Sequence, residues 1–326
     1  MNAKFSMLFV GFLGGAVYNL NAQSTEQNSS PKQLVEALHT TFGEHHARAV
    51  HAKGIILKGD FTPDAQAKEL TKAFHLQETK SEVIVRFSDF TGIPDIPDNS
   101  GMANPRGLAI KFKSPNGATT DIVGHSFNGF PTSNSDEFRE LLLAIAASGK
   151  DAAKPTRLEL FLAAHPIAKS FLTSQKNPAS FGTISYFGVN SFQFTNVKGE
   201  SHYVRYQFIP EKGEELLTNE QMANSGHDYL SDEIKARVAK HPVVFKMYAE
   251  LAEEGDQIGN PSVAWPANRK KVLLGTISIN QLSSNTSAED RALSFNPNNI
   301  PDGIKTADPM LNLRSKAYPI SVKERQ

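Results

Sequence analysis

The sequence predicts an α+β fold, in which one antiparallel β-barrel carries inserted and flanking helices. Short strand-like segments with turn residues between them fill residues 50–123, and similar segments return between residues 188 and 279. Between these two groups, residues 136–178 place their apolar side chains at helical spacing. Strands and helices in separate runs are typical of α+β folds, and closure into a barrel leaves an antiparallel sheet without free edges.

The size and composition indicate a globular protein. The chain has 326 residues, of which 39% are hydrophobic and 21% are charged, which is enough to bury one large core or two ordinary ones. Lysine plus arginine number 34, and aspartate plus glutamate also number 34. Because there is no excess of positive charge, the chain has no general attraction for nucleic acids or anionic membranes. Neither is expected as a partner.

The first 22 residues differ from the rest of the chain. Lys4 precedes an apolar run over residues 5–20, which ends in Asn-Ala and a polar stretch. This order is typical of a secretory signal, and the run is too short and too rich in glycine for stable membrane insertion. We therefore expect a signal peptide over residues 1–22, cleaved after Ala22, with an uncleaved anchor as the alternative. A periplasmic location is expected, and the absence of cysteine suits an export compartment.

The first elements of the mature chain are a helix and a group of strands. A polar lead and one amphipathic helix, with Leu34, Leu38 and Phe42 on its apolar face, fill residues 23–45. A long loop over residues 91–104 is rich in proline and glycine and breaks regular structure. Strands are expected at 54–57, 83–87, 108–112 and 121–123.

The second half begins with helices and returns to strands. Two or three helices are expected within residues 136–178. A further helix is expected from about residue 231 to residue 254. Strands are expected at 188–194, 203–209 and 272–279.

The C-terminal segment carries the most informative pair of residues. Asp308 and Pro309 are suited to the start of a helix. Arg314 and Tyr318 then lie four residues apart, so the guanidinium can reach the phenol oxygen one turn away. A phenol ordinarily ionises near pH 10, but an adjacent permanent cation and a ferric ion both favour the phenolate. The pair therefore suits a tyrosine ligand to iron.

Several segments together resemble the catalase superfamily, and in particular a short, catalase-related peroxidase. The resemblance extends from about residue 45 to Tyr318. Its motifs are Arg48-Ala49-Val50-His51-Ala52-Lys53-Gly54, Arg86-Phe87-Ser88, Asn104-Pro105-Arg106-Gly107 and Phe295-Asn296-Pro297, followed by Arg314-x-x-x-Tyr318-Pro319. It implies a single catalase-like haem domain over residues 46–326, without the C-terminal helical domain of full catalases. It also implies haem b with Tyr318 as the axial iron ligand and Arg314 as its partner.

The same resemblance also implies roles for the residues that face the peroxide and the haem propionates. His51 becomes the residue that takes a proton from the bound peroxide and returns it to the leaving oxygen, a role that suits an imidazole. Ser88 becomes the hydrogen-bond partner that orients His51. Arg48 and Arg86 become partners of the haem propionates, and Arg325 is a third candidate for that role.

One position departs from the pattern of full catalases. The family carries an asparagine on the distal side, in a segment that resembles Asp121-Ile122-Val123-Gly124-His125-Ser126. We expect Ser126 to take its place, with His125 and Asn128 near enough to substitute. The shorter hydroxyl predicts weaker binding of the second peroxide that a catalase must oxidise. Six other histidines are expected in solvated or helix-capping roles: His45, His46, His75, His165, His227 and His241.

These expectations combine into a haem-dependent peroxidase of organic hydroperoxides, with hydrogen peroxide as a second candidate substrate. It would use an external electron donor, would have weak catalase activity, and would act as a monomer or small homo-oligomer. Two alternatives stay open at this point. One is a haem isomerase or dehydratase that rearranges fatty-acid hydroperoxides without a donor, and the other is a non-catalytic haem-binding barrel.

Overall fold

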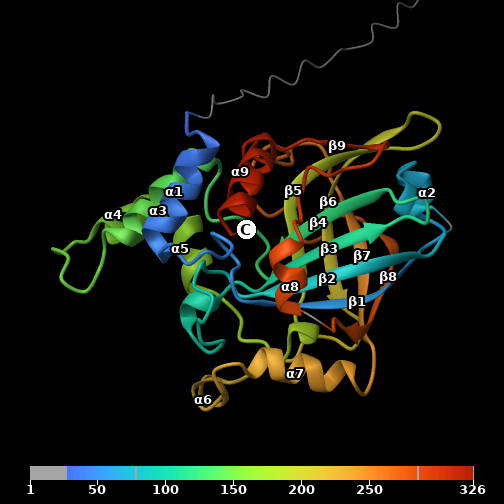
Figure 1. Ribbon diagram of the computed structural model, residues 1–326. Helices are drawn as coiled ribbons and strands as arrows, with labels where there is room; N and C mark the ends of the chain where they lie inside the picture. Colours follow the sequence, from blue (N-terminus) through green and yellow to red (C-terminus); the bar gives the residue numbers. More distant parts are fainter. Residues whose placement is uncertain (1–27, 78, 285, 326) are drawn as a thin grey trace, which may run out of the picture.

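The computed structural model describes residues 28–77, 79–284 and 286–325. The predicted signal peptide over residues 1–22 lies outside the described residues. Figure 1 shows a β-barrel with one group of helices on its left and α7 below it. Among the described helices, none has both the length and the apolar character needed to cross a membrane. The helices are α1 (Pro31–Phe42), α2 (Ala67–Leu70), α3 (Ser135–Ala146), α4 (Arg157–Ala164), α5 (Pro166–Thr173), α6 (Asn219–Ala223), α7 (Tyr229–Val238), α8 (Thr286–Ala292) and α9 (Met310–Glu324).

The strands form one antiparallel sheet that closes on itself. Their order is β4-β3-β2-β1-β8-β7-β6-β5-β9, and β4 also pairs with β5, at His125 and Phe187. This last pairing closes β1 to β8 into a barrel, while β9 is added beside β5. The predicted antiparallel barrel with helices is therefore confirmed. The strands are β1 (Gly54–Pro63), β2 (Ser81–Ser88), β3 (Gly107–Lys113), β4 (Thr119–His125), β5 (Tyr186–Thr195), β6 (Ser201–Pro210), β7 (Val243–Leu251), β8 (Lys271–Leu282) and β9 (Ile304–Thr306).

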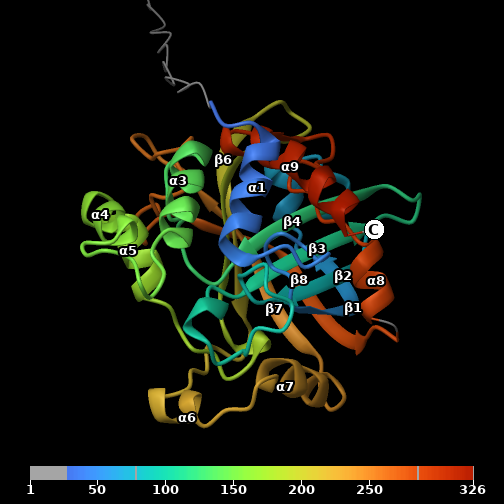
Figure 2. The same cartoon turned by 60° about the vertical axis from the view of Figure 1, so that its left-hand side comes forward.

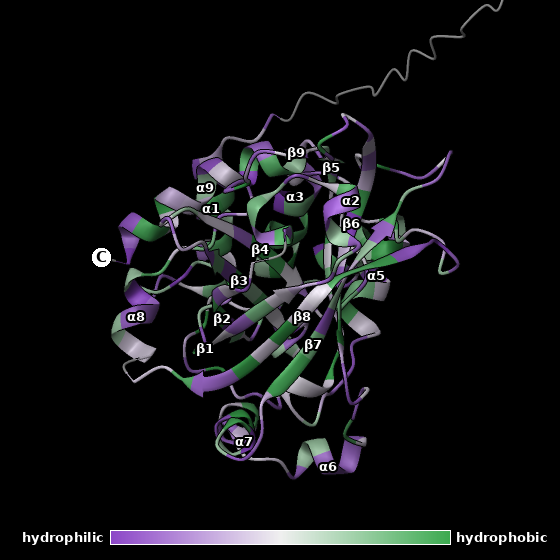
Figure 3. Ribbon diagram, turned by 90° about the vertical axis from the view of Figure 1, so that its right-hand side faces the viewer, coloured by the Kyte–Doolittle hydropathy of each residue, from purple (hydrophilic) through white to green (hydrophobic). Residues whose placement is uncertain are grey.

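The helix expected from about residue 231 to residue 254 is wrong in its second half. Helix α7 ends at Val238, and strand β7 begins at Val243. Buried and partly buried residues alternate along β7, which is the period of a strand packed on one face. Figure 3 shows apolar residues along β7 beside β8. Residues 231–254 therefore hold a helix and a barrel strand.

Alternation along β2 separates the barrel core from the functional face. Val83, Val85 and Phe87 point into the main core, which fills the barrel interior. Ile84 and Arg86 point to the opposite, outer face, together with Ser88. On this outer face Ile84 packs with Ile56 and Phe295. The outer face of β2 is thus the surface on which polar groups of a site can collect.

Three helices cover that outer face. Residues of α1, α3 and α9 form a second core, which includes Leu38, Leu142 and Leu313. Figures 1 and 2 show α1 between α3 and α9, beside the end of the barrel that holds β2, β3 and β4. Helix α9 continues through Pro319 to Glu324. A layer of helices therefore faces a layer of strands, with the candidate site between them.

His75 does not have the solvated or capping role expected for it. Its side chain is fully buried, and within the described chain neither ring nitrogen has a hydrogen-bond partner. The ring packs 4.8 Å from the ring of Phe112. Burial lowers the pKa of His75 to about 3, since a charged imidazole cannot be solvated in the core. His75 is a neutral core residue.

This burial predicts a loss of stability in acid. The unfolded chain binds a proton at His75 below its ordinary pKa of about 6.5, whereas the folded chain does so only near pH 3. The free energy of unfolding therefore falls as the pH drops from about 6.5 towards 3, by about 2 kcal/mol at pH 5 from this residue. His75→Leu should reduce this slope in urea unfolding at several pH values. A His241→Asn control changes an exposed histidine, and equal slopes in the His75→Leu variant and the unaltered protein would contradict the account.

Candidate functional site

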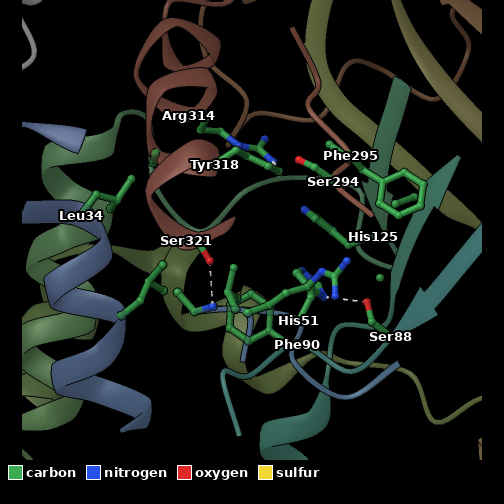
Figure 4. Close-up of a pocket in the computed structure, with 18 of the residues that line it drawn as sticks. Leu34, His51, Ser88, Phe90, His125, Ser294, Phe295, Arg314, Tyr318 and Ser321 are labelled. Carbon is green, nitrogen blue, oxygen red and sulfur yellow. Dashed lines mark hydrogen bonds between the residues drawn. The ribbon is translucent and has the colours of Figure 1, made fainter. Parts of the chain in front are cut away.

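The main cavity lies between the outer face of the barrel and the helical layer. Strand residues form one wall, α9 forms the opposite wall, and α1 and α3 close the side (Figure 4). The polar residues that line it come from both walls and include most of the predicted site residues. They are Arg48, His51, Arg86, Ser88, His125, Ser135, Asn190, Ser294, Arg314, Tyr318, Ser321 and Arg325.

The helical wall presents a tyrosine that is already paired with a cation. Arg314 donates a hydrogen bond from Nη2 to the Tyr318 hydroxyl oxygen, at 2.9 Å. Its Nη1 donates to Asn190 Oδ1 at 2.7 Å, and Asn190 Nδ2 donates to Asp308 Oδ2 at 2.6 Å. Four side chains therefore form one chain of hydrogen bonds that fixes the guanidinium against the phenol. The predicted pairing of Arg314 and Tyr318 occurs as the spacing indicated.

Asn190 is a cavity residue that the sequence pattern does not identify. The pattern predicts a barrel strand for its segment, and Asn190 does lie in β5. However, the pairing of β5 with β6 shifts register between Gly188 and Phe192, which marks a bulge. Bulges re-aim side chains and are frequent beside active sites. Asn190, which accepts the hydrogen bond from Arg314, lies within this bulge.

His51 is held in an unusual backbone conformation. Its φ is 58°, a region that residues other than glycine seldom adopt. Its backbone N–H donates to the Phe90 carbonyl at 2.8 Å, and its Nδ1 lies 3.0 Å from Ser88 Oγ. Such strain persists only where the surroundings over-determine it, and it is concentrated at functional sites. Burial, followed by the charge of Arg86, lowers the pKa of His51 to about 3, so the ring is neutral at ordinary pH.

The pairing of β2, β3 and β4 aligns site residues across the three strands. Ser88 in β2 pairs with Gly107 in β3, and Gly107 pairs with His125 in β4. The ring of His51 lies over this row, because a Cβ at Gly107 would be only 2.6 Å from His51 Nδ1. Opposed residues in neighbouring strands have Cβ atoms about 5 Å apart. His51, Ser88 and His125 therefore share one small region of the cavity.

Gly107 has no side chain, and the His51 imidazole occupies the space that a Cβ atom would fill. Gly107→Ala should therefore displace His51. We expect the free energy of unfolding to fall by about 1–3 kcal/mol, as overpacking does, with loss of the His51–Ser88 contact. Chemical denaturation and histidine NMR signals would measure both effects. Gly149→Ala is the matched control, since its Cβ would meet no atom within 4 Å. If Gly107→Ala behaves as this control does, the crowding argument is wrong.

Ser126 is not part of the cavity wall, and the expectation for it is corrected. Residues Val123 and His125 of β4 face the cavity, as a two-residue period requires. Ser126 lies beyond the end of the strand, and its hydroxyl accepts a hydrogen bond from the Arg106 backbone N–H at 2.9 Å. Asn128 does not line the cavity either. Of Ser126, Asn128 and His125, only His125 lines the cavity.

The three predicted arginines form a cluster at one edge of the cavity. Arg48 Nη1 lies 2.6 Å from Asp290 Oδ2, and Arg86 also bonds this carboxylate. Arg325 donates to the Leu293 carbonyl at 2.6 Å, and Arg48 donates to the same oxygen. Burial and then the neighbouring charge of Arg86 lower the pKa of Arg48 to about 9. Asp290 is a second contact that the sequence reasoning missed.

The charges and the apolar lining of the cavity suit a haem. In the described part of the chain, Arg48 and Arg86 bond the Asp290 carboxylate, whereas Arg325 donates to the backbone carbonyls of Arg291 and Leu293, so three guanidinium groups gather around one carboxylate. A haem carries two propionates, and bidentate arginine is the usual partner for a buried carboxylate. The apolar lining suits the porphyrin, and Tyr318 provides a phenol for the iron. The residues that would hold the group are therefore Tyr318, Arg48, Arg86 and Arg325.

Comparisons with known proteins show the family to which the chain belongs. Residues 32–326 match the family model described as Catalase. The chain is 31% identical over 304 residues to a catalase-related peroxidase of Synechococcus elongatus, covering 91% of this chain and 88% of the relative. It is 32% identical over 302 residues to a catalase-related peroxidase of Mycolicibacterium paratuberculosis, covering 91% and 95%.

Full-length catalases are more distant. A catalase of Alkalihalophilus pseudofirmus is 27% identical over 296 residues, and the match covers 83% of this chain but 43% of that protein. The structure of catalase A from Saccharomyces cerevisiae superimposes with a TM-score of 0.76 at 19% identity, over 86% of this chain and 61% of that one. This similarity concerns the fold. The chain therefore belongs to the catalase family, as its motifs predicted.

Proposed function

We propose that this catalase-family peroxidase binds haem b and reduces organic hydroperoxides, and also hydrogen peroxide, with electrons from an external donor. Its catalase activity is proposed to be weak, because two relatives that match most of this chain are named peroxidases. One observation carries the proposal: Tyr318 and His51 lie on opposite walls of the same cavity. Tyr318 is hydrogen-bonded to Arg314, and His51 is in hydrogen-bond contact with Ser88. The relatives of Synechococcus elongatus and Mycolicibacterium paratuberculosis, which match this chain over most of both lengths, are named catalase-related peroxidases. The net reaction converts ROOH, two electrons and two protons to ROH and water.

In this proposal the protein holds the haem by its iron and by its propionates. Tyr318 would supply the phenol oxygen that binds the iron, with the Arg314 guanidinium 2.9 Å from that oxygen. Arg48, Arg86 and Arg325 would pair with the propionates. When bound, the haem would supply the redox-active iron at which a peroxide is reduced.

His51 moves the proton. Because its pKa is lowered to about 3, the ring is neutral and can accept the hydroperoxide proton throughout the ordinary pH range. It then gives this proton to the oxygen that leaves as the O–O bond breaks. The contact of Ser88 with Nδ1 at 3.0 Å fixes the ring, so that Nε2 is the nitrogen left for the substrate. This is the orienting role of a third group in a catalytic array.

The cavity wall favours an organic peroxide. Leu34, Val35 and Leu38 of α1 line it, and Phe138 of α3 lies beside them. Apolar side chains stabilise the hydrocarbon part of a hydroperoxide by removing it from water. We also propose, from the N-terminal sequence pattern, export to the periplasm, and action as a monomer or small homo-oligomer.

The proposal is tested with protein purified after haem supplementation. We expect a bulky aryl hydroperoxide to be converted to its alcohol only when a phenolic donor is present, with stoichiometric oxidation of the donor. Oxygen release from hydrogen peroxide should be slow. Donor consumption, alcohol formation and oxygen release are measured in the same samples.

Other outcomes identify the alternatives. Rearranged or dehydrated products formed without a donor would make the protein an isomerase or dehydratase. Haem binding without any peroxide turnover would make it a carrier. Rapid, sustained oxygen release without donor oxidation would make it a true catalase, and failure to bind haem would refute the proposal as a whole.

A further inference from the structure

Asp290 contacts the arginines at the cavity edge without lining the cavity itself. Its Oδ1 accepts a hydrogen bond from Arg86 Nε at 2.5 Å, and its Oδ2 lies 2.6 Å from Arg48 Nη1. Both arginines line the cavity, whereas Asp290 does not. Among the described side chains, Asp290 is the one carboxylate that bonds either guanidinium. It therefore pairs with two cations of the site and leaves the cavity space to a ligand.

The short helix that carries Asp290 is anchored to the barrel. Glu289 of α8 accepts a hydrogen bond from Lys58 of β1 at 3.0 Å and another from Ser283 at 2.6 Å. Figures 1 and 2 both show α8 next to the C-terminal end of α9. There Arg325 donates to the carbonyls of Arg291 and Leu293, at 3.3 Å and 2.6 Å. The place of Asp290 among the arginines is thus fixed by the barrel.

The arginines are too deeply buried for water to compensate their charges. The Arg86 side chain is 3% exposed, and that of Arg48 is 11% exposed. Burial and then the charge of Arg86 lower the pKa of Arg48 to about 9, and Asp290 acts in the opposite direction. Removing one partner of a buried ion pair is strongly destabilising, because the other charge is left buried and unpaired. These cations therefore need an anion.

We propose that Asp290 is the internal counter-ion of the haem-free protein, which holds Arg48 and Arg86 at the cavity edge until haem propionates pair with the same guanidinium groups. The inference rests on the proposed function, in which these arginines bind the propionates. Asp290 is a positioning residue, because it acts through the arginines. Two anions that share the same cations oppose each other, so Asp290 and haem each weaken the hold of the other on the cluster.

Haem affinity tests this opposition. Asp290→Asn should bind haem about tenfold more tightly than the unaltered protein, which is the scale of one hydrogen bond to a charged group. Haem dimethyl ester, whose propionates carry no charge, should bind equally to both proteins. Absorbance titration measures the dissociation constants of both ligands. Asp232→Asn, which changes an exposed carboxylate on α7, is the matched control and should alter neither constant.

Unfolding in urea tests the role of counter-ion. The haem-free Asp290→Asn variant should unfold at a lower urea concentration than the unaltered haem-free protein, and saturating haem should remove most of this difference. Adding Arg48→Gln to Asp290→Asn removes both members of one ion pair. In haem-free protein the double variant should therefore lose less stability than the sum of the two single changes. Equal losses with and without haem would overturn the inference.

A third measurement uses the unaltered protein, so it does not depend on whether a variant folds. In haem-free protein with ¹⁵N-labelled arginine, the Arg86 Nε–H should exchange slowly with water, because it is buried and donates to Asp290. Its signal is identified by its loss in Arg86→Lys. Zinc protoporphyrin, which is diamagnetic and carries both propionates, should shift this signal, whereas its dimethyl ester should not. Fast exchange, or the same response to both porphyrins, would overturn the inference.

The outcomes separate the two proposals. Haem binding that is unchanged or weaker in Asp290→Asn, or an equal gain for haem and its dimethyl ester, would overturn the role of Asp290 alone. Failure of the unaltered protein to bind haem would refute the proposed function and, with it, the inference.

Discussion

Replacing Tyr318 with phenylalanine should abolish stable haem binding while the fold persists. The phenol oxygen is the only atom removed, and it is the atom that Arg314 contacts at 2.9 Å. The ring still packs on α9 beside the buried Ala317, so the barrel should be unaffected. We expect the dissociation constant for haem, measured by absorbance titration, to rise by several orders of magnitude, as the loss of an iron ligand implies.

The matched control is Tyr248→Phe, which removes a phenol oxygen from β7, a strand outside the cavity wall. Circular dichroism should show the same β and helical content in both variants and in the unaltered protein. If Tyr318→Phe binds haem as tightly as the control, the iron ligand lies elsewhere.

Arg314→Leu should have a smaller effect of the same kind. Haem still binds, because Tyr318 remains, but the phenol oxygen loses the hydrogen bond and the positive charge of Arg314. Acid should then release haem at a higher pH than in the unaltered protein. A pH titration of the bound-haem absorbance measures the midpoint. An unchanged midpoint would mean that Arg314 has only a structural role in the chain that includes Asn190 and Asp308.

His51→Gln should slow the reaction with peroxide by about 10² to 10⁴-fold, the usual contribution of a positioned acid and base. Glutamine keeps much of the ring's volume but cannot accept and return a proton. Haem affinity should change little, because His51 is assigned to neither the iron nor the propionates. Stopped-flow absorbance after mixing with an organic hydroperoxide measures the rate, and haem titration provides the second readout.

The Ser88→Ala variant helps to interpret that result. It keeps the imidazole but removes the hydroxyl that lies 3.0 Å from Nδ1, so we expect an intermediate rate. A His51→Gln variant that reacts with hydroperoxide at the rate of the unaltered protein would contradict the assignment of His51. The same rate in Ser88→Ala would contradict only the orienting role of Ser88.

Local patterns explain why much of the fold and site could be predicted. Period-two alternation located the strands, and it correctly put Arg86 and Ser88 on one face of β2. Arg314 and Tyr318 are one helical turn apart, so their contact depends only on α9. The strand at 243–251 was missed because the following acidic residues extend the helical character of α7. His241-Pro242 nevertheless marks the break, since the residue before proline leaves the helical region.

Other parts of the site depend on pairing and tertiary contacts that a linear pattern does not contain. A shift of one residue in β4 exchanges the two faces of a strand, so a match to the family segment that is off by one residue puts Ser126 in place of His125. Counting in steps of two from Val123 would have identified His125. Asn190 reaches Arg314 across 124 positions of sequence, and Asp290 meets Arg86 across 204. Neither contact has a local signal.

The central claim is that the Tyr318 phenolate binds haem iron in the cavity opposite His51. The most direct measurement is the resonance Raman spectrum of the haem-loaded ferric protein, prepared with ordinary tyrosine and with ring-deuterated tyrosine. The account predicts iron-bound phenolate bands that shift on deuteration and are present in the Tyr248→Phe control. Haem bound without any band that shifts with the labelled tyrosine would contradict it.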